Sequence, residues 1–202
     1  MKTQRPLPEE LQDRPFTVVE AVRAGVSHKR LRHRTLHRLG KGIRSESPTA
    51  ELPLTDRVRP FIEVNERCAA SHLTAAEMLL LPRRQQKGTP EMFHVIRPEG
   101  SAHLNRPHVI VHRMKLYSDE VATVDGIPVT TPERSWLDMA EMLTVDELVA
   151  MGDSCVRVPR AAFEDRDMPL CSLADLQRMI DRHKKARATQ GQGSHQTHPR
   201  GI

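Results

Sequence analysis

A helix-turn-helix pattern near the N-terminus constrains the fold of this chain more than any other feature. Thr17 is suited to cap a first helix, and Gly25 can adopt the left-handed conformation that ends it. Ser27 can then cap a second helix that extends to about residue 33 or 34. Two short helices joined at a glycine form the helix-turn-helix motif. We therefore expect residues 15–46 to form such a module.

The residues after the second helix allow two interpretations. The segment Gly40-Lys-Gly42 has the composition of a tight turn, which would join the flanking residues 36–39 and 43–45 into a β-hairpin, the wing of a winged helix. Leu31, Thr35 and Leu39 also fit the stripe of one continuous helix without a wing. We favour the hairpin because of its turn chemistry.

The basic charge of the chain is concentrated in the same region. The whole chain carries a net charge of +5, whereas residues 1–50 alone, with eleven Lys/Arg and five Asp/Glu, carry +6. No acidic residue occurs between Glu20 and Glu46, although apolar residues recur there at a regular spacing that a disordered basic arm would lack. This distribution favours a surface that binds a polyanion, here double-stranded DNA.

We expect the DNA contacts to come from the second helix and the wing. Leu31 faces inward on a helical wheel, and the basic side chains cluster on the opposite side. Recognition of RNA by stacking is less favoured because aromatic residues make up only 3% of the chain. The predicted DNA-binding residues are Ser27, His28, Lys29, Arg30, Arg32, His33, Arg34, His37, Arg38, Lys41 and Arg44.

The remaining residues predict an α+β protein in which a mixed α/β domain follows the winged helix-turn-helix. This domain would hold a small antiparallel sheet and a helical C-terminal part. The predicted divisions are a flexible lead-in at 1–14, the winged module at 15–46, a linker at 47–55, the mixed domain at 56–185 and a disordered tail at 186–202.

Local patterns predict the elements of the mixed domain. Asp125-Gly126 between two apolar runs indicates a hairpin of 121–124 with 127–130, and Thr144 with Glu147 is a capping box. The other expected elements are helices over Phe61–Ala70, Leu73–Leu80, 132 to about 142, 145 to about 156 and one starting at Ser172, and strands over Met92–Ile96 and Val109–Val111.

The sequence predicts neither a metal site nor an enzyme, and no cofactor. The three cysteines are widely spaced, and the histidine pairs 33/37, 108/112 and 195/198 lack a nearby third ligand. A restriction-endonuclease core needs Glu-x-Lys, and no acidic residue here is followed two positions later by lysine. Because no signal peptide or long apolar run is present, we expect a cytoplasmic protein without membrane contact.

Three segments together resemble a known family. They are the helix-turn-helix with its Gly-x-Gly-Ile turn, the segment Ser71-His-Leu-Thr-Ala-Ala-Glu-Met-Leu-Leu-Leu-Pro82, and the segment Val124-Asp-Gly-Ile-Pro-Val-Thr-Thr-Pro-Glu-Arg-Ser-Trp-Leu-Asp138, which is followed by Glu147–Asp153. Over roughly residues 15–157 they resemble the AbiEi-type antitoxins of type IV toxin–antitoxin systems. The chain departs from the family pattern at Arg34, where a glycine is frequent, and at Ile43-Arg44, where the wing of relatives closes with Val-Tyr.

The resemblance implies an autorepressor, a regulator of transcription whose second domain counters a nucleotidyltransferase-like toxin. Many relatives continue into a C-terminal domain similar to very-short-patch-repair and restriction endonucleases, which is missing here. Our leading hypothesis is a sequence-specific DNA-binding regulator of the antitoxin type, which could act as a homodimer. The alternatives are an antitoxin domain that binds protein without significant DNA binding, and a truncated, non-catalytic relative of a nuclease.

Overall fold

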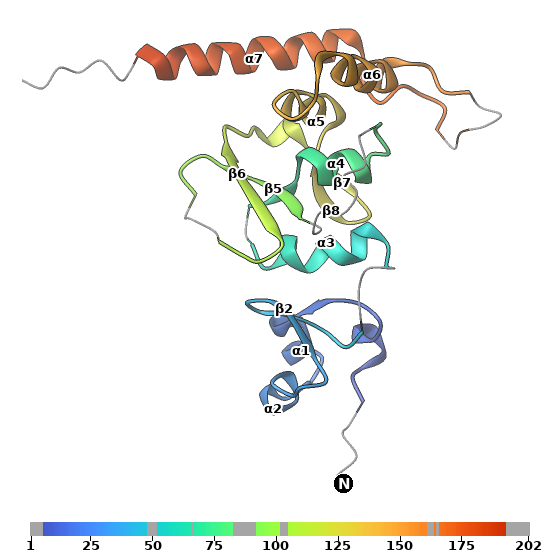
Figure 1. Cartoon of the computed structure of the whole chain (residues 1–202), viewed down its shortest axis with the longest axis vertical. Coiled ribbons are helices and arrows are strands. Elements are labelled where there is room, and N and C mark those ends of the chain that lie inside the picture. The colour runs from blue at the N-terminus through green and yellow to red at the C-terminus, as the bar shows by residue number, and fades with distance from the viewer. Residues whose placement is uncertain are drawn as a thin grey trace, which may run out of the picture.

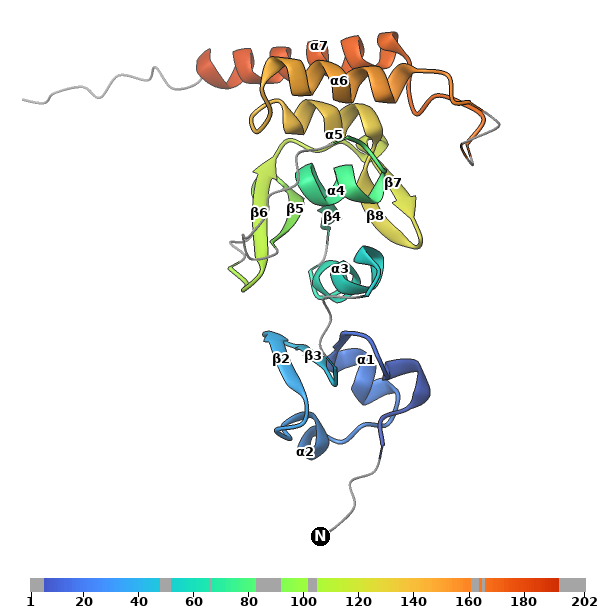
Figure 2. The same cartoon turned by 45° about the vertical axis from the view of Figure 1, so that its right-hand side comes forward.

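The chain folds into an N-terminal module, residues 6–47, that lies against a larger domain, residues 52–192 (Figure 1). The structure is a computed structural model that describes residues 6–47, 52–65, 67–82, 92–101, 105–160, 164 and 166–192. The module stands at one end of the molecule, and helices α5, α6 and α7 stack at the opposite end, beyond the sheet of the larger domain (Figure 2). The architecture is α+β, with one small antiparallel sheet and one mixed five-stranded sheet.

The N-terminal module combines two short helices with a three-stranded antiparallel sheet in the order β1-β3-β2. Residues 37–40 and 43–45 pair as a hairpin, so the hairpin interpretation is confirmed and the continuous helix is wrong. The elements are a 3-10 turn Glu9–Leu11, β1 Phe16–Thr17, α1 Val18–Arg23, α2 His28–Leu31, β2 His37–Gly40 and β3 Ile43–Ser45.

The caps expected for the two helices are present. Thr17 accepts a hydrogen bond from the Glu20 amide, and the Glu20 carboxylate accepts one from the Thr17 amide, which completes a capping box. Gly25 ends α1 with a φ of 82°. The Ser27 hydroxyl accepts from the Arg30 amide at the start of α2. Local sequence therefore determines where both helices begin.

Helix α2 is shorter than expected. It ends at Leu31, whereas the sequence predicted an end at residue 33 or 34. The Arg44 side chain of the hairpin donates from Nε to the Leu31 carbonyl at 3.2 Å. Thr35 accepts a hydrogen bond from the Arg30 guanidinium at 2.8 Å, which holds the chain in a turn after the helix. Contacts from the hairpin thus compete with further helical hydrogen bonds.

Residues 6–14 are ordered, so the predicted flexible lead-in is wrong over these positions. Leu7 and Leu11 are buried, and Leu11 belongs to the 3-10 turn. They form an apolar cluster with residues of both helices, which gives the lead-in a place to pack. The cluster is Leu7, Leu11, Phe16, Ala21, Val26, Leu31 and Leu36.

The larger domain is built on a five-stranded mixed sheet in the order β6-β5-β4-β8-β7, larger than the small antiparallel sheet that we expected. The pairs β5–β6 and β4–β8 are parallel, and β4–β5 and β7–β8 are antiparallel. The expected β7–β8 hairpin is confirmed. The strands are β4 Ala69–Ala70, β5 Phe93–Pro98, β6 Val109–Met114, β7 Val121–Val124 and β8 Ile127–Thr130.

Helices cover both faces of this sheet. Helix α3, Leu54–Glu63, lies between the sheet and the N-terminal module, and the remaining helices lie on the other side (Figure 2). These are α4 His72–Met78, α5 Pro132–Met139, α6 Val145–Val156 and α7 Leu173–Gln192. A short 3-10 helix, Ser118–Glu120, precedes β7.

Three boundaries differ from the sequence expectation. The helix expected over 61–70 is wrong, because α3 starts at Leu54, inside the predicted linker, and continues through Pro60, while residues 69–70 form β4. Burial of Val58, Phe61 and Ile62 outweighs the cost of the proline. Helix α7 extends to Gln192, past residue 185, where we expected the tail to begin; residues 193–202 lie outside the described residues.

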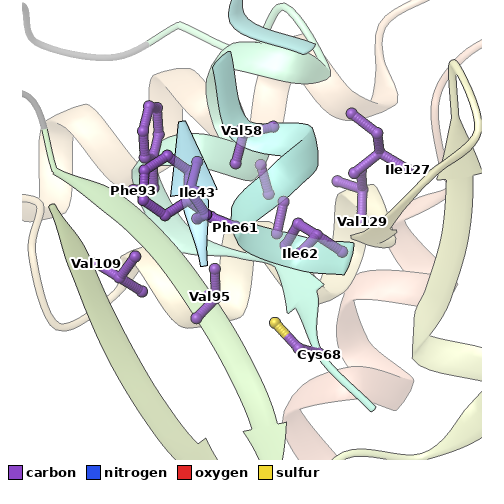
Figure 3. Packing of buried hydrophobic residues seen from close by; sticks show 12 residues of the cluster. Ile43, Val58, Phe61, Ile62, Cys68, Phe93, Val95, Val109, Ile127 and Val129 are labelled. Carbon is purple, nitrogen blue, oxygen red and sulfur yellow. The ribbon is translucent and has the colours of Figure 1, made fainter. Parts of the chain in front are cut away.

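The module and the larger domain share one hydrophobic core. Ile43 of β3 is fully buried in the same cluster as Val58 and Phe61 of α3 and Phe93 of β5 (Figure 3). The Phe61 and Phe93 rings lie 5.0 Å apart between their centroids. The hairpin therefore packs on α3 and does not project freely into solvent.

Candidate functional site

The basic residues of the N-terminal module form an exposed surface around α2 and the start of β2. Helix α2 lies at the end of the module farthest from α3 (Figures 1 and 2). The sequence between Glu20 and Glu46 contains no acidic residue to neutralise this surface. We call it the basic surface; its exposed or half-exposed members are His28, Lys29, Arg32, His33, Arg34, His37 and Arg38, with Ser27 beside them.

Two arginines face one another across the hairpin. Arg38 of β2 and Arg44 of β3 are directly opposed in the antiparallel pair, so their side chains leave the same face of the sheet. Burial, followed by the positive charge of Arg38, lowers the pKa of Arg44. Like charges in this arrangement repel one another, and an anion bound between them would relieve the repulsion.

Some predicted DNA-binding residues make internal contacts. Arg30 forms an ion pair with Glu46 at 2.8 Å, and its other terminal nitrogen donates to Thr35. Arg44 donates to the main-chain carbonyls of Leu31, Gly40 and Ile43. Arg30 and Arg44 therefore position the turn and the hairpin.

Lys41 lies apart from the rest of the basic surface. Its side chain is exposed, but its main-chain carbonyl accepts a hydrogen bond from Arg106 of the larger domain. It follows β2 at the end of the hairpin next to α3, about 13 Å of strand from His37. An extended ligand is needed to contact Lys41 together with α2.

The larger domain contains a buried network of charges at the start of α5. Arg134 and Glu120 are both fully buried and form an ion pair at 2.5 Å, and Arg134 also pairs with Asp138 at 2.8 Å. Arg182 and His183 of α7 reach the second Glu120 oxygen at 3.1 and 2.9 Å. This network joins the β7–β8 hairpin region to α5 and α7, and a pocket of about 400 Å³ opens beside it.

Burial raises the pKa of Asp138 to about 6, although the adjacent Arg134 acts to lower it. The Asp138 Oδ2 atom is buried and has no hydrogen-bond partner among the described residues, which agrees with a carboxyl group that retains its proton below that pH.

The fold places side by side three histidines that no sequence motif connects. His72 starts α4, His94 lies in β5 and His112 lies in β6. Gaps of 22 and 18 residues separate them in the sequence, so no short metal-binding motif marks them. Only the sheet and α4 make them neighbours.

The family model of the AbiEi antitoxin C-terminal domain matches residues 68–152. Over these residues the chain is similar to that domain. The antitoxin domain thus runs from β4 to the middle of α6 and contains the sheet, the three histidines, Arg134 and Asp138. The match confirms the resemblance that the motifs at 71–82 and 124–138 indicated. The basic surface lies outside the matched residues.

No curated protein matches the chain. The crystal structure of the RV2827C protein from Mycobacterium tuberculosis is similar, with a TM-score of 0.48 and 16% identity. The similarity covers 83% of this chain and 66% of that one, so the chain spans just under two thirds of that protein. Among the described residues, no helix combines the length and apolar character needed to cross a membrane.

Proposed function

We propose that the protein is an antitoxin-type transcriptional regulator that binds duplex DNA through the basic surface and a toxin through its antitoxin domain. The observation that carries the DNA-binding part is the exposed cluster of cations on α2 and β2, in a stretch of sequence without acidic residues. Contacts of lysine and arginine with phosphates supply most of the affinity of such surfaces. The protein then acts by binding and not by catalysis.

The opposed pair Arg38 and Arg44 supports an anionic ligand. Arg44 is held by three main-chain carbonyls and cannot move away from Arg38 without losing those hydrogen bonds. A phosphate group bound beside Arg38 lowers the repulsion between Arg38 and Arg44. Because the free protein carries this repulsion, its relief adds to the affinity for the phosphate. The DNA-binding residues of the proposal are therefore the members of the basic surface, exposed or half-exposed: Ser27, His28, Lys29, Arg32, His33, Arg34, His37, Arg38 and, for a long site, Lys41.

Binding to the DNA upstream of the protein's own gene tests this proposal. Fluorescence anisotropy compares a labelled duplex of that region with a scrambled duplex of equal length, each over a series of salt concentrations. About six phosphate contacts give a slope of log affinity against log salt near −5. A protein that shows no binding to either duplex at low salt contradicts the proposal, and equal affinity for both duplexes contradicts sequence-specific regulation.

A triple variant locates the surface. Lys29→Ala/Arg34→Ala/Arg38→Ala removes three exposed cations, and we expect the salt slope to become less steep by about 3. The matched control removes three exposed cations of the larger domain: Arg113→Ala/Arg160→Ala/Lys184→Ala. If both triple variants weaken binding equally, net charge and not the basic surface is responsible.

A second function is favoured by the range of the family match. The matched residues 68–152 exclude the basic surface, so an antitoxin domain that works by protein contact alone is the alternative. Co-expression with a nucleotidyltransferase-like toxin encoded beside this gene distinguishes the two. Neutralisation that survives the triple variant Lys29→Ala/Arg34→Ala/Arg38→Ala assigns toxin binding to the antitoxin domain, independently of DNA.

A further inference from the structure

Three histidine side chains converge on one face of the five-stranded sheet, where α4 covers it. His94 of β5 and His112 of β6 lie on the same face, because His112 pairs in register with Ile96, two residues from His94. His72 reaches them from the first residue of α4, which packs on β5. One potential ligand atom from each of the three lies within 4.8 Å of those of the others.

The rings are already close to a shared centre. Nδ1 of His94 and Nε2 of His112 are 3.0 Å apart. The His72 ring stacks on the His112 ring with centroids 3.5 Å apart, and the His94 and His112 centroids are 5.2 Å apart. Two nitrogens that bind one tetrahedral Zn²⁺ are separated by about 3.3 Å, given bonds of about 2.0 Å. The stacked rings of His72 and His112 must rotate for one nitrogen of each histidine to point at a single ion.

The surroundings favour imidazole as a ligand. His72 and His94 are buried, and a buried site favours the neutral imidazole that keeps a lone pair for a metal. Nδ1 of His72 is hydrogen-bonded to the Ser71 hydroxyl at 3.0 Å, which leaves Nε2 for the ion. The Glu141 carboxylate lies near His112, and its negative charge complements a dication.

The backbone at His72 is strained. His72 has a φ of 48°, in the left-handed region that residues with a side chain seldom occupy. Such strain persists where the surrounding structure requires the residue to point in one direction, and it recurs at ligand sites. From this position the His72 ring stacks on the His112 ring.

We propose that His72, His94 and His112 bind one divalent transition-metal ion of the Zn²⁺ class, with a fourth position open to water or to a carboxylate. Three neutral imidazoles suit Zn²⁺, Co²⁺, Ni²⁺ and Cu²⁺, and do not suit Mg²⁺ or Ca²⁺, which prefer oxygen ligands. His112 is half-buried and provides the approach from solvent, whereas His72 and His94 are buried. A bound ion ties α4, β5 and β6 together within the antitoxin domain.

Titration of the full chain with Co²⁺ tests the site directly. The protein is prepared without a histidine tag and freed of metal with a chelator. We expect one equivalent of Co²⁺ to give the visible absorption bands of a tetrahedral or five-coordinate site, and Zn²⁺ to remove them. Absence of these bands, together with no binding of Zn²⁺ by calorimetry, overturns the proposal.

Variants locate the ion. His112→Gln and His94→Gln are each expected to lower Zn²⁺ affinity at least about 100-fold, and Ser71→Ala about 10-fold. The matched control is His108→Gln, an exposed histidine just before β6, which leaves affinity unchanged. His195→Gln/His198→Gln excludes chelation near the C-terminus in the same way. Unchanged affinity in His112→Gln, or an equal loss in His108→Gln, places the metal elsewhere and contradicts the proposal.

Thermal unfolding distinguishes a variant that has lost the metal site from one that has failed to fold. Zn²⁺ stabilises the folded wild-type chain and therefore raises its Tm, because the unfolded chain does not hold the three rings together. Because His112 is half-buried, the His112→Gln chain is expected to unfold cooperatively in chelator but to show no rise in Tm with Zn²⁺. A rise equal to that of the wild type contradicts the site.

Discussion

The guanidinium of Arg106 donates a hydrogen bond to the main-chain carbonyl of Lys41, 65 residues earlier in the chain. The same side chain donates to Asn65 Oδ1 at 3.1 Å, and Asn65 in turn donates to the Phe61 carbonyl near the end of α3. The tip of the hairpin is thus held by a polar link beside the apolar contact of Ile43. The N-terminal module has a defined orientation on the larger domain.

Because the core is shared, we expect a destabilising substitution in the N-terminal module to destabilise the larger domain as well. Ile43→Ala removes a fully buried side chain, and we expect it to cost about 2–5 kcal/mol of unfolding free energy. Urea unfolding followed by the fluorescence of Trp136, the single tryptophan, reports on the α5–α6 region. The Trp136 midpoint should fall in Ile43→Ala and stay constant in Val19→Ala, whose side chain is 59% exposed in the same module. An unchanged Trp136 midpoint in Ile43→Ala would show that the two parts unfold independently.

The opposed arginines predict opposite effects on stability and on DNA binding. Arg38→Gln removes the charge that faces Arg44, so we expect a gain of about 0.2–1 kcal/mol in unfolding free energy and a weaker complex with DNA. Thermal unfolding and anisotropy measure the two quantities on one preparation. Arg113→Gln, an exposed arginine of β6, is the control and should change neither appreciably. Tighter DNA binding by Arg38→Gln is incompatible with a phosphate beside Arg38.

The buried Arg134 network predicts a large loss of stability when its cation is removed. Arg134→Met leaves Glu120 and Asp138 without their buried counter-charge, at a cost of about 3–5 kcal/mol. Chemical denaturation measures this cost. Arg178→Met on α7 removes an exposed partner of Asp175 and is expected to cost under about 1 kcal/mol. Similar losses in both variants would mean that the Arg134 pairs contribute little.

Asp138 predicts a specific dependence of stability on pH. Its pKa is raised from 3.8 to about 6 in the folded state, so between these values the folded chain holds a proton that the unfolded chain has released. The contribution of Asp138 therefore falls as pH rises from 4 to 6 and stays low above that. Asp138→Asn removes this dependence, so its stability relative to the wild type should rise by about 1–3 kcal/mol between pH 4 and pH 7. Parallel pH profiles of the two proteins would contradict the raised pKa.

Cys155 and Cys171 are expected to form a disulfide under mild oxidation. The Cys171 thiol is hydrogen-bonded to Cys155 and thereby lowers the pKa of Cys155, and the Cys171 amide donates to the Cys155 carbonyl at 3.2 Å. Diamide should oxidise the two thiols with loss of two hydrogens, which intact mass detects, and leave Cys68 as the thiol that maleimide labels after denaturation. In Cys171→Ser the intramolecular disulfide cannot form, so the loss of two hydrogens should disappear. Disulfide-linked dimers in place of the intramolecular product would argue against the pairing.

Local sequence signals predicted the elements that carry their own start and stop residues. Thr17, Gly25 and Ser27 mark α1 and α2, Asp125-Gly126 marks the β7–β8 hairpin, and Thr144 marks α6, because caps and tight turns are decided within a few residues. The motif at 124–138 also indicated the similarity to the AbiEi antitoxin C-terminal domain. These parts of the fold needed no long-range information.

Elements that depend on contacts between residues distant in sequence were not predicted. Ala69-Ala70 is a strand because it lies between β5 and β8, and two alanines alone carry no strand signal. Helix α3 continues through Pro60 because the sheet and Ile43 cover its apolar face. The three histidines likewise gave no signal, because their proximity depends on the register of β5 with β6. Local propensity contains none of these facts.

The late pairing of β4 with β8 has a consequence for synthesis on the ribosome. The apolar cluster of the N-terminal module closes within residues 7–36, whereas Ala70 must wait for Val129 before the centre of the sheet is complete. At roughly 5–20 residues per second, Val129 is made about 5–20 seconds after Leu36. Until Val129 is made, the core around Ile43 is incomplete, so we expect Ile43 to be less well covered on the nascent chain than in the finished protein.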